Sequence, residues 1–182
     1  MSANMSLASK SNVAAIGPSL QRCTAALRAL AGARSWIRAL ELLTEMHDTG
    51  PAPDIVCYNA ALGACARAPA PAAALTLLQG MPLWNLKPDT ISYNATMTAC
   101  GRAQRWLQVL ELMQEMRSRC VASSSVTRGA VVSACDKASK WAAALHFAFE
   151  GLPNLESSEP NLLVYSAAIS ACGKGTRWDL AW

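Results

Sequence analysis

The sequence predicts an all-α protein in which helix-turn-helix units of about 35 residues stack into a solenoid. The repeated cysteines are Cys65, Cys100, Cys135 and Cys172, spaced 35, 35 and 37 residues apart. Their surroundings repeat as GACARA, TACGRA, SACDKA and SACGKG. Tryptophans follow six residues later at Trp106, Trp141 and Trp178, and Trp36 lies two periods before Trp106. No β-strand pattern competes, so the period indicates one supersecondary unit stacked on copies of itself.

The period divides the chain into an N-terminal tail, residues 1–19, and a repeat array over residues 20–182. The units are 20–54, 55–89, 90–124, 125–161 and an incomplete 162–182. Each unit is expected to hold two helices. The first helix, such as 91–103, is dominated by apolar and small residues, which predicts that it is largely buried.

The second helix, such as 105–117, is predicted to be amphipathic. Its apolar residues Leu107, Leu110, Met113 and Met116 follow one another at three-residue steps, with Glu111 and Glu115 on the other side. Proline marks the connection to the next unit, because it cannot continue a helix. The units end in Pro53-Asp54, Pro88-Asp89, Ser123-Ser124 and Pro160-Asn161. The last residue of each can accept a hydrogen bond from the free amides of the next helix.

Composition limits the classes of function. Hydrophobic residues make up 52% of the chain and charged residues 15%, which fits helices buried on two sides. No apolar run reaches the ~18 residues of a membrane span, so no membrane partner is expected. The seven cysteines include no CxxC pair or Cys/His cluster, so we expect buried thiols and neither a metal nor another cofactor. The tryptophans are expected to pack between units.

The tail is rich in serine and alanine and contains no acidic residue, since the first acid of the chain is Glu41. This composition resembles an organelle transit segment, although a disordered tail would read the same way. The expected location is therefore a plastid or mitochondrion, or otherwise the soluble interior of the cell. The chain stops at Trp182, about five residues into a predicted second helix, which suggests a fragment of a longer protein.

Several motifs resemble the pentatricopeptide repeat family. Tyr-Asn opens the first helix in Val56-Cys57-Tyr58-Asn59 and Ile91-Ser92-Tyr93-Asn94, with Leu163-Val164-Tyr165-Ser166 as a variant. The Ala-Leu-Glu-Leu run at 39–42 is echoed at 109–112, and Met46, Met81 and Met116 close the second helices. The fourth unit departs from the pattern, with Arg128-Gly129 in place of Tyr-Asn. The resemblance covers about residues 20–182 and implies a right-handed α-solenoid.

The resemblance also implies sequence-specific binding of single-stranded RNA, with one base read by each unit. The reading pair is an early first-helix residue together with the last residue of the unit. Carried over, the pairs are Thr24 with Asp54, Asn59 with Asp89, Asn94 with Ser124, and Gly129 with Asn161, while Ser166 holds the first-helix reading position of the fifth unit. The first three pairs imply guanine, uracil and a pyrimidine, read 5′ to 3′. Val56 and Ile91 would wedge against the bases.

A row of basic residues follows two positions after the repeated cysteines: Arg67, Arg102, Lys137 and Lys174. Such a row suits a phosphate backbone. Four phosphate contacts would give log affinity a slope of roughly −3 against log salt, at ~0.7 per contact. Alternatively, these side chains compensate the dipoles of helix C-termini, and Asp54, Asp89, Ser124 and Asn161 act only as helix caps.

We therefore expect an RNA-binding adaptor in organellar RNA processing, stability or translation, together with other organellar RNA-processing proteins. A protein-binding scaffold of the tetratricopeptide type is the alternative. The 35-residue period, the Tyr-Asn motif and tryptophans in the second helix favour RNA over that alternative. An enzyme is not expected, because the two histidines, His47 and His146, lie about three units apart and no catalytic group converges with them.

Overall fold

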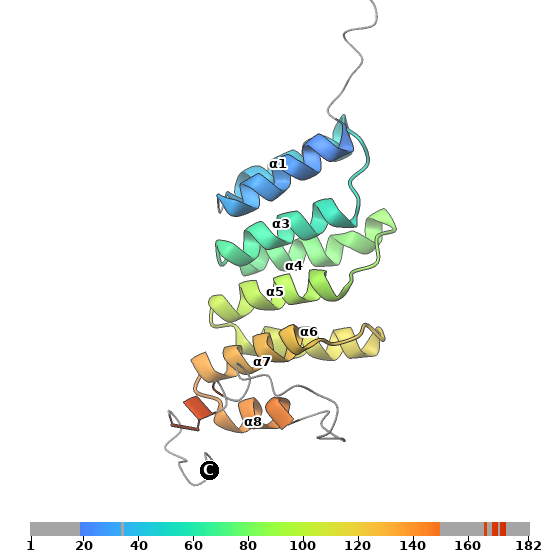
Figure 1. Cartoon of the computed structure of the whole chain (residues 1–182). Coiled ribbons are helices and arrows are strands. Elements are labelled where there is room, and N and C mark those ends of the chain that lie inside the picture. The colour runs from blue at the N-terminus through green and yellow to red at the C-terminus, as the bar shows by residue number, and fades with distance from the viewer. Residues whose placement is uncertain (1–18, 34, 150–165, 167–168, 171, 174–182) are drawn as a thin grey trace, which may run out of the picture.

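The computed structural model describes residues 19–33, 35–149, 166, 169–170 and 172–173, and these residues form an array of paired helices (Figure 1). The α-helices are α1 (Leu20–Gly32), α2 (Trp36–Asp48), α3 (Ile55–Arg67), α4 (Pro71–Gly80), α5 (Thr90–Arg102), α6 (Trp106–Ser118), α7 (Ser125–Lys137) and α8 (Trp141–Phe149). A short 3-10 helix, η1 (Met81–Trp84), follows α4. The part of the chain that the structure describes contains no strand.

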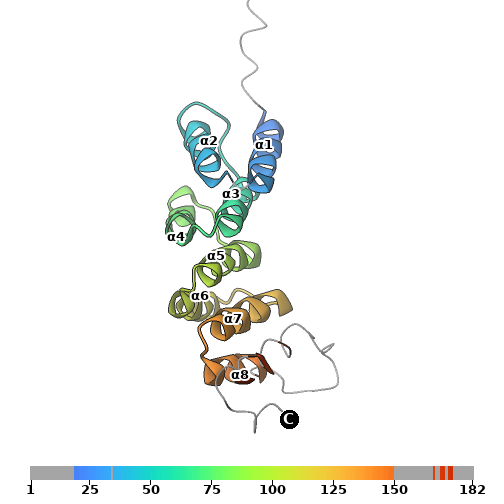
Figure 2. The same ribbon diagram turned by 90° about the vertical axis from the view of Figure 1, so that its left-hand side faces the viewer.

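The helices form two layers. The odd-numbered helices α1, α3, α5 and α7 pack on one another in chain order, and α2, α4 and α6 lie to one side of them (Figure 2). Each of these three second helices contacts the first helix of its own unit and the first helix of the next. The predicted all-α solenoid is therefore confirmed.

The core runs along the stack because buried residues recur with the repeat. Leu27, Leu62, Met97 and Val132 are 35 residues apart, one on each odd-numbered helix, and all are 0% exposed. Met46 on α2, Met81 at the start of η1 and Met116 on α6 are also buried. Trp36, Trp106 and Trp141 are partly buried against the core, as predicted. Each helix pair thus shares its apolar side chains with its neighbours, as a solenoid requires.

One detail of the predicted second helix is wrong. Leu107 is 58% exposed, whereas the buried face of α6 consists of Val109, Leu112, Met113 and Met116. The physical reason is geometric: a step of three residues falls short of the 3.6-residue turn. Residues that follow one another at three-residue steps therefore drift around the helix, so the first residue of such a run does not lie on the same face as the last.

The repeated cysteines are buried, as predicted. Burial raises the pKa of the thiols of Cys65, Cys100 and Cys135 to about 11. Cys120, two residues after the end of α6, is exposed. Because the thiolate is the reactive form, we expect iodoacetamide at pH 8 to label Cys120 within minutes and the three buried thiols only after denaturation. Peptide mass spectrometry of native and denatured samples checks this, and fast native labelling of Cys100 would contradict it.

Candidate nucleic-acid interface

The last residue of each of the first three units caps the next odd-numbered helix, as predicted. The side chain of Asp54 accepts a hydrogen bond from the backbone amide of Cys57 at 2.9 Å, and Asp89 accepts from Ser92 at 2.8 Å. Ser124 accepts from the amide of Thr127 at 3.2 Å. These caps satisfy amide groups that the helix itself leaves free. They also fix each last residue at the start of a helix, beside the preceding unit.

The structure brings the second predicted pair together. Asn59 Nδ2 lies 3.3 Å from both carboxylate oxygens of Asp89 and donates to them. The Ser92 hydroxyl donates to Asn59 Oδ1 at 2.6 Å. Asn59 and Asp89 therefore form one polar group that crosses from α3 to the start of α5. Half-burial of both residues leaves part of this group open to solvent.

The third pair is held more loosely. Asn94 Nδ2 donates to Ser124 Oγ at 3.4 Å, which is long for a hydrogen bond. Asn94 Oδ1 is buried and finds no hydrogen-bond partner among the described residues. Among the described residues, the side-chain amide of Asn94 is thus hydrogen-bonded through its nitrogen alone, whereas that of Asn59 is hydrogen-bonded through both its nitrogen and its oxygen.

The first predicted pair is not joined by a direct hydrogen bond in the described region. The Thr24 hydroxyl donates to the carbonyl of Leu20 at 2.7 Å, one turn earlier in its own helix. It also lies 3.3 Å from Cys57 Sγ. The threonine side chain is shorter than asparagine and finds this local acceptor. Asp54 therefore keeps its capping bond without the cross-unit contact seen for Asp89.

A buried tyrosine anchors the helix beside each of the two asparagines. The hydroxyl of Tyr58 lies 2.9 Å from His47 Nε2, and Tyr93 donates to Glu115 at 3.2 Å. Burial and the neighbouring Glu115 carboxylate raise the pKa of Tyr93 to about 12. Both tyrosines reach toward the second-helix layer. They hold their helices so that the next residue, Asn59 or Asn94, lies at the boundary with the following unit.

The two predicted wedge residues are exposed apolar side chains: Val56 is 37% exposed and Ile91 is 61% exposed. A third member, Val126, is 64% exposed and occupies the same register on α7. Val126 was not predicted as a wedge residue, because the Tyr-Asn motif that marks the position is absent from the fourth unit. The 35-residue spacing from Ile91 is the signal that identifies it.

The predicted basic row lies at the ends of the odd-numbered helices. Arg67, Arg102 and Lys137 are the last residues of α3, α5 and α7, and all are exposed. Arg102 also donates from Nη1 to the backbone carbonyl of Ala66 at 3.1 Å. That bond supports the alternative role in capping a helix C-terminus, while the other guanidinium N–H groups can still serve a ligand.

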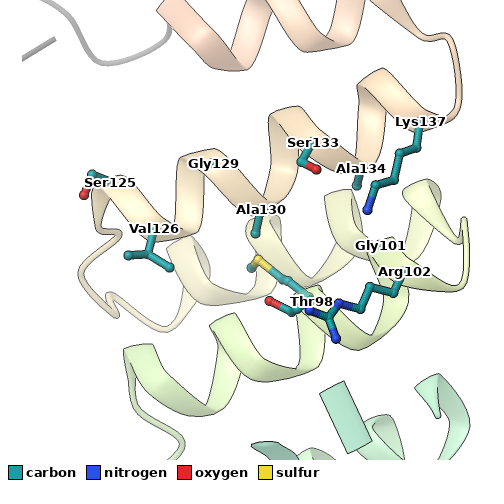
Figure 3. Close-up of a pocket in the computed structure, with 11 residues that line it drawn as sticks. Thr98, Gly101, Arg102, Ser125, Val126, Gly129, Ala130, Ser133, Ala134 and Lys137 are labelled. Atoms are coloured by element: carbon teal, nitrogen blue, oxygen red, sulfur yellow. The ribbon is translucent and has the colours of Figure 1, made fainter. Parts of the chain in front are cut away.

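A groove of about 360 Å³ runs between α5 and α7 (Figure 3). Ser125 and Val126 line one end, and Arg102 and Lys137 line the other (Figure 3). Gly129, which stands at the reading position of the fourth unit, forms part of the wall. The groove therefore joins the apolar wedge position to the basic row, and its middle carries no amide or carboxylate side chain.

Other predicted positions contribute less to the described interface. Ser166 is exposed. Asn161 and Lys174 lie outside the described residues, as do Trp178, most of the unit 162–182 and residues 1–18 of the tail. Within the described region, no group of three or more His, Cys, Asp or Glu side chains is arranged to hold a metal ion. None of its helices is both long and apolar enough to cross a bilayer.

Models of one repeat family match overlapping parts of the sequence. A pentatricopeptide repeat domain model matches residues 6–68, a PPR repeat family model matches 53–102, and a PPR repeat model matches 91–121. Together they cover more than half of the chain without a gap. The chain belongs to the pentatricopeptide repeat family. No curated protein matches the sequence.

Solved pentatricopeptide repeat structures share the fold. PPR10 from maize superposes with a TM-score of 0.76 at 19% identity, over 91% of this chain and 23% of PPR10. PPR10 in complex with an 18-nucleotide psaJ RNA element gives a TM-score of 0.63 at 25% identity, over 89% of this chain and 27% of that one. The PPR domain of Arabidopsis thaliana protein-only RNase P 1, solved with tRNA, gives 0.71 at 12% identity, over 86% and 82%.

This pentatricopeptide repeat chain thus spans about a quarter of the length of PPR10. Within the family's repeat register, Asn59 and Asn94 lie 35 residues apart, and their partners Asp89 and Ser124 keep the same spacing. Val56, Ile91 and Val126 keep that spacing too. The second and third units therefore each present an exposed apolar side chain, a polar pair and, at the end of the first helix, a cation, whereas the fourth unit has Gly129 at the reading position.

Proposed function

We propose that this pentatricopeptide repeat chain is an adaptor that binds single-stranded RNA and reads one base with each unit. The observation that carries the proposal is the contact between Asn59 and Asp89, a first-helix residue and a last residue joined across two units. The contact between Asn94 and Ser124 repeats it one unit later. PPR10 and the PPR domain of RNase P 1, which share this fold, were solved with RNA.

The chemistry of the steps fits single-stranded RNA. Unstacked bases expose their Watson–Crick edges, and amide or carboxylate side chains can hydrogen-bond to those edges. After its bonds to Asp89 and Ser92, Asn59 retains one N–H and one lone pair, so it can offer a donor and an acceptor. The exposed Ile91 and Val126 supply apolar surface against which base faces can pack.

The basic row fits the phosphates of the same strand. Arg67, Arg102 and Lys137 recur once per unit, which is the spacing that one base per unit requires. Cationic side chains along a groove supply affinity that does not depend on sequence. Specificity then falls to the polar pairs, for which the family's pairing habit gives guanine, uracil and a pyrimidine.

The wider role follows from the same proposal. We assign the chain to RNA processing, stability or translation in a plastid or mitochondrion, in concert with other processing proteins, on the strength of its acid-free, serine- and alanine-rich N-terminus. The proposed activity is binding, since the polar side chains of the interface are engaged in pairs and helix caps.

The direct test is fluorescence anisotropy with the 182-residue chain and RNA that carries a 5′-GUC or 5′-GUU core. We expect tighter binding than to a scrambled core. Varying the fourth base is an internal control, because Gly129 offers no side chain to read it. Binding that is sensitive to salt but indifferent to sequence would discard the base assignments. No RNA binding by the folded protein would favour the protein-scaffold alternative.

Replacing Asn59 by threonine should move the preference at the second base from uracil to guanine, since a threonine and an aspartate then form the pair, as Thr24 and Asp54 do in the first unit. We expect a change of about tenfold in the ratio of the two affinities, because good base contacts discriminate by ~1–3 kcal/mol. Competition between RNAs that differ only at this base measures the ratio. An unchanged ratio would show that Asn59 does not read the base.

A further inference from the structure

We propose that Ser92 is a positioning residue that orients the amide of Asn59, and thereby sets how sharply the second unit discriminates its base. This inference rests on the proposed reading of RNA. Ser92 belongs to a different unit from Asn59, is 0% exposed and cannot itself meet a base. Its effect on specificity must therefore pass through the side chain that it contacts.

Ser92 stands at a repeated structural position. Cys57, Ser92 and Thr127 are each the third residue of an odd-numbered helix, 35 residues apart, and all three are 0% exposed. Each donates its backbone amide to the capping residue three positions earlier. The backbone role is thus the same in all three units, and only the side chains differ.

The hydroxyl of Ser92 fixes where the oxygen of Asn59 lies. The two oxygens are 2.6 Å apart, which is a typical O–H···O hydrogen-bond distance. A proton must lie between them, because two oxygen lone pairs would repel each other at this separation. Ser92 Oγ also lies 2.9 Å from Asp89 Oδ1. It carries a single proton, and the shorter contact places that proton toward Asn59.

Asp89 fixes the other end of the amide. Its carboxylate accepts from Asn59 Nδ2 at 3.3 Å through both oxygens. A flipped amide would place Oδ1 against the carboxylate, so that two acceptors would face each other. The contacts with Ser92 and Asp89 together allow one orientation of the Asn59 amide, so its remaining N–H donor and oxygen lone pair point in defined directions.

The third unit shows the same arrangement without the positioning bond. The hydroxyl of Thr127 accepts from the amide of Ser124 at 3.0 Å and lies 3.1 Å from its hydroxyl. Among the described residues, Asn94 Oδ1 has no hydrogen-bond partner, and its Nδ2 donates to Ser124 Oγ alone, at 3.4 Å. Because a hydroxyl both donates and accepts, Ser124 tolerates either orientation of this amide. The second unit should therefore discriminate more sharply than the third.

The experiment compares Ser92→Ala with Thr127→Ala in the 182-residue chain. Each variant removes the hydroxyl that accepts the capping residue's amide, at Asp89 or at Ser124, so the loss to the helix cap is matched. Only Ser92→Ala removes a bond to a reading asparagine, whereas Thr127→Ala removes a contact with Ser124, the partner of Asn94. Affinities are measured for RNAs that vary at the second base and, separately, at the third.

We expect the ratio of uracil over cytosine affinity at the second base to fall about fivefold in Ser92→Ala, the worth of one neutral hydrogen bond. Thr127→Ala should leave the second-base ratio unchanged. If Ser92→Ala folds and keeps the wild-type ratio, or if both variants lose discrimination equally, the inference is overturned. Should Ser92→Ala not fold, Ser92→Cys replaces it, since Cys57 already occupies this position and a thiol is a weak donor.

A measurement without RNA distinguishes failure of the positioning role of Ser92 from failure of the proposed RNA binding. NMR of the asparagine side-chain amides should show slow hydrogen exchange for Asn59 in the wild type and in Thr127→Ala, and faster exchange in Ser92→Ala. If the wild type binds no RNA, the proposed function fails whatever NMR shows. If Asn59 exchange is unchanged in Ser92→Ala, the positioning role fails even where RNA binds.

Discussion

Replacing Arg67, Arg102 and Lys137 together by alanine should flatten the salt dependence of RNA binding. Each phosphate contact on a single strand contributes ~0.7 to the slope of log affinity against log salt, so the slope should become shallower by about 2. The three side chains are exposed at the ends of α3, α5 and α7, so their removal leaves the core intact. Anisotropy titrations across a salt series give the slope directly.

The matched control removes three positive charges elsewhere. Arg38, Lys87 and Arg105 are also exposed but do not belong to the basic row. Their replacement changes the net charge equally, so it should weaken binding slightly through the overall field and leave the slope nearly unchanged. Equal losses of slope in the two triple variants would mean that the protein attracts RNA by net charge and makes no phosphate contacts at the row.

Leu62→Ala should be the most damaging single substitution in the second unit. Leu62 is 0% exposed on α3, which packs against both α1 and α5. Truncating such a side chain leaves a cavity and destabilises a protein by about 2–5 kcal/mol. At ~2–4 °C for each kcal/mol, Tm should fall by roughly 4–20 °C. Thermal unfolding followed by circular dichroism checks this.

Leu83→Ala provides the comparison within the same unit. Leu83 is 83% exposed on η1, so its truncation should leave Tm within about 2 °C of the wild type. A similar fall for both variants would mean that Leu83 is buried in solution. An unchanged Tm for Leu62→Ala would contradict the packing of the odd-numbered helices against one another.

The period of the sequence predicted the architecture because backbone geometry and burial repeat together. Cys65, Cys100 and Cys135 are buried since each occupies the same place on equivalent helices. The helix caps were equally predictable, because proline followed by aspartate determines where one helix must stop and the next can start. These features depend on residue type and position along the chain, which the sequence states directly.

The details of the polar interface were less predictable, because they depend on distances that a period does not contain. Thr24 and Asn59 occupy equivalent positions, yet the hydroxyl of Thr24 bonds within its own helix while the amide of Asn59 reaches Asp89. Arg102 bonds to a carbonyl of the preceding unit, which neither charge nor spacing foretold. The role of Ser92 was hidden because serine, cysteine and threonine are interchangeable as small buried residues.

The carboxylate of Asp89 makes two kinds of contact, since it caps α5 and also accepts hydrogen bonds from Asn59. Loss of such a cap costs about 1 kcal/mol. Evolution of this position is therefore restricted to side chains that can still cap a helix, namely aspartate, asparagine, serine and threonine. Residues 59 and 94 lie inside α3 and α5 and cap no helix, so this constraint does not apply to them. If a relative of this protein acquires a new RNA target, we expect residues 59 and 94 to change first. The capping residues should change only among aspartate, asparagine, serine and threonine.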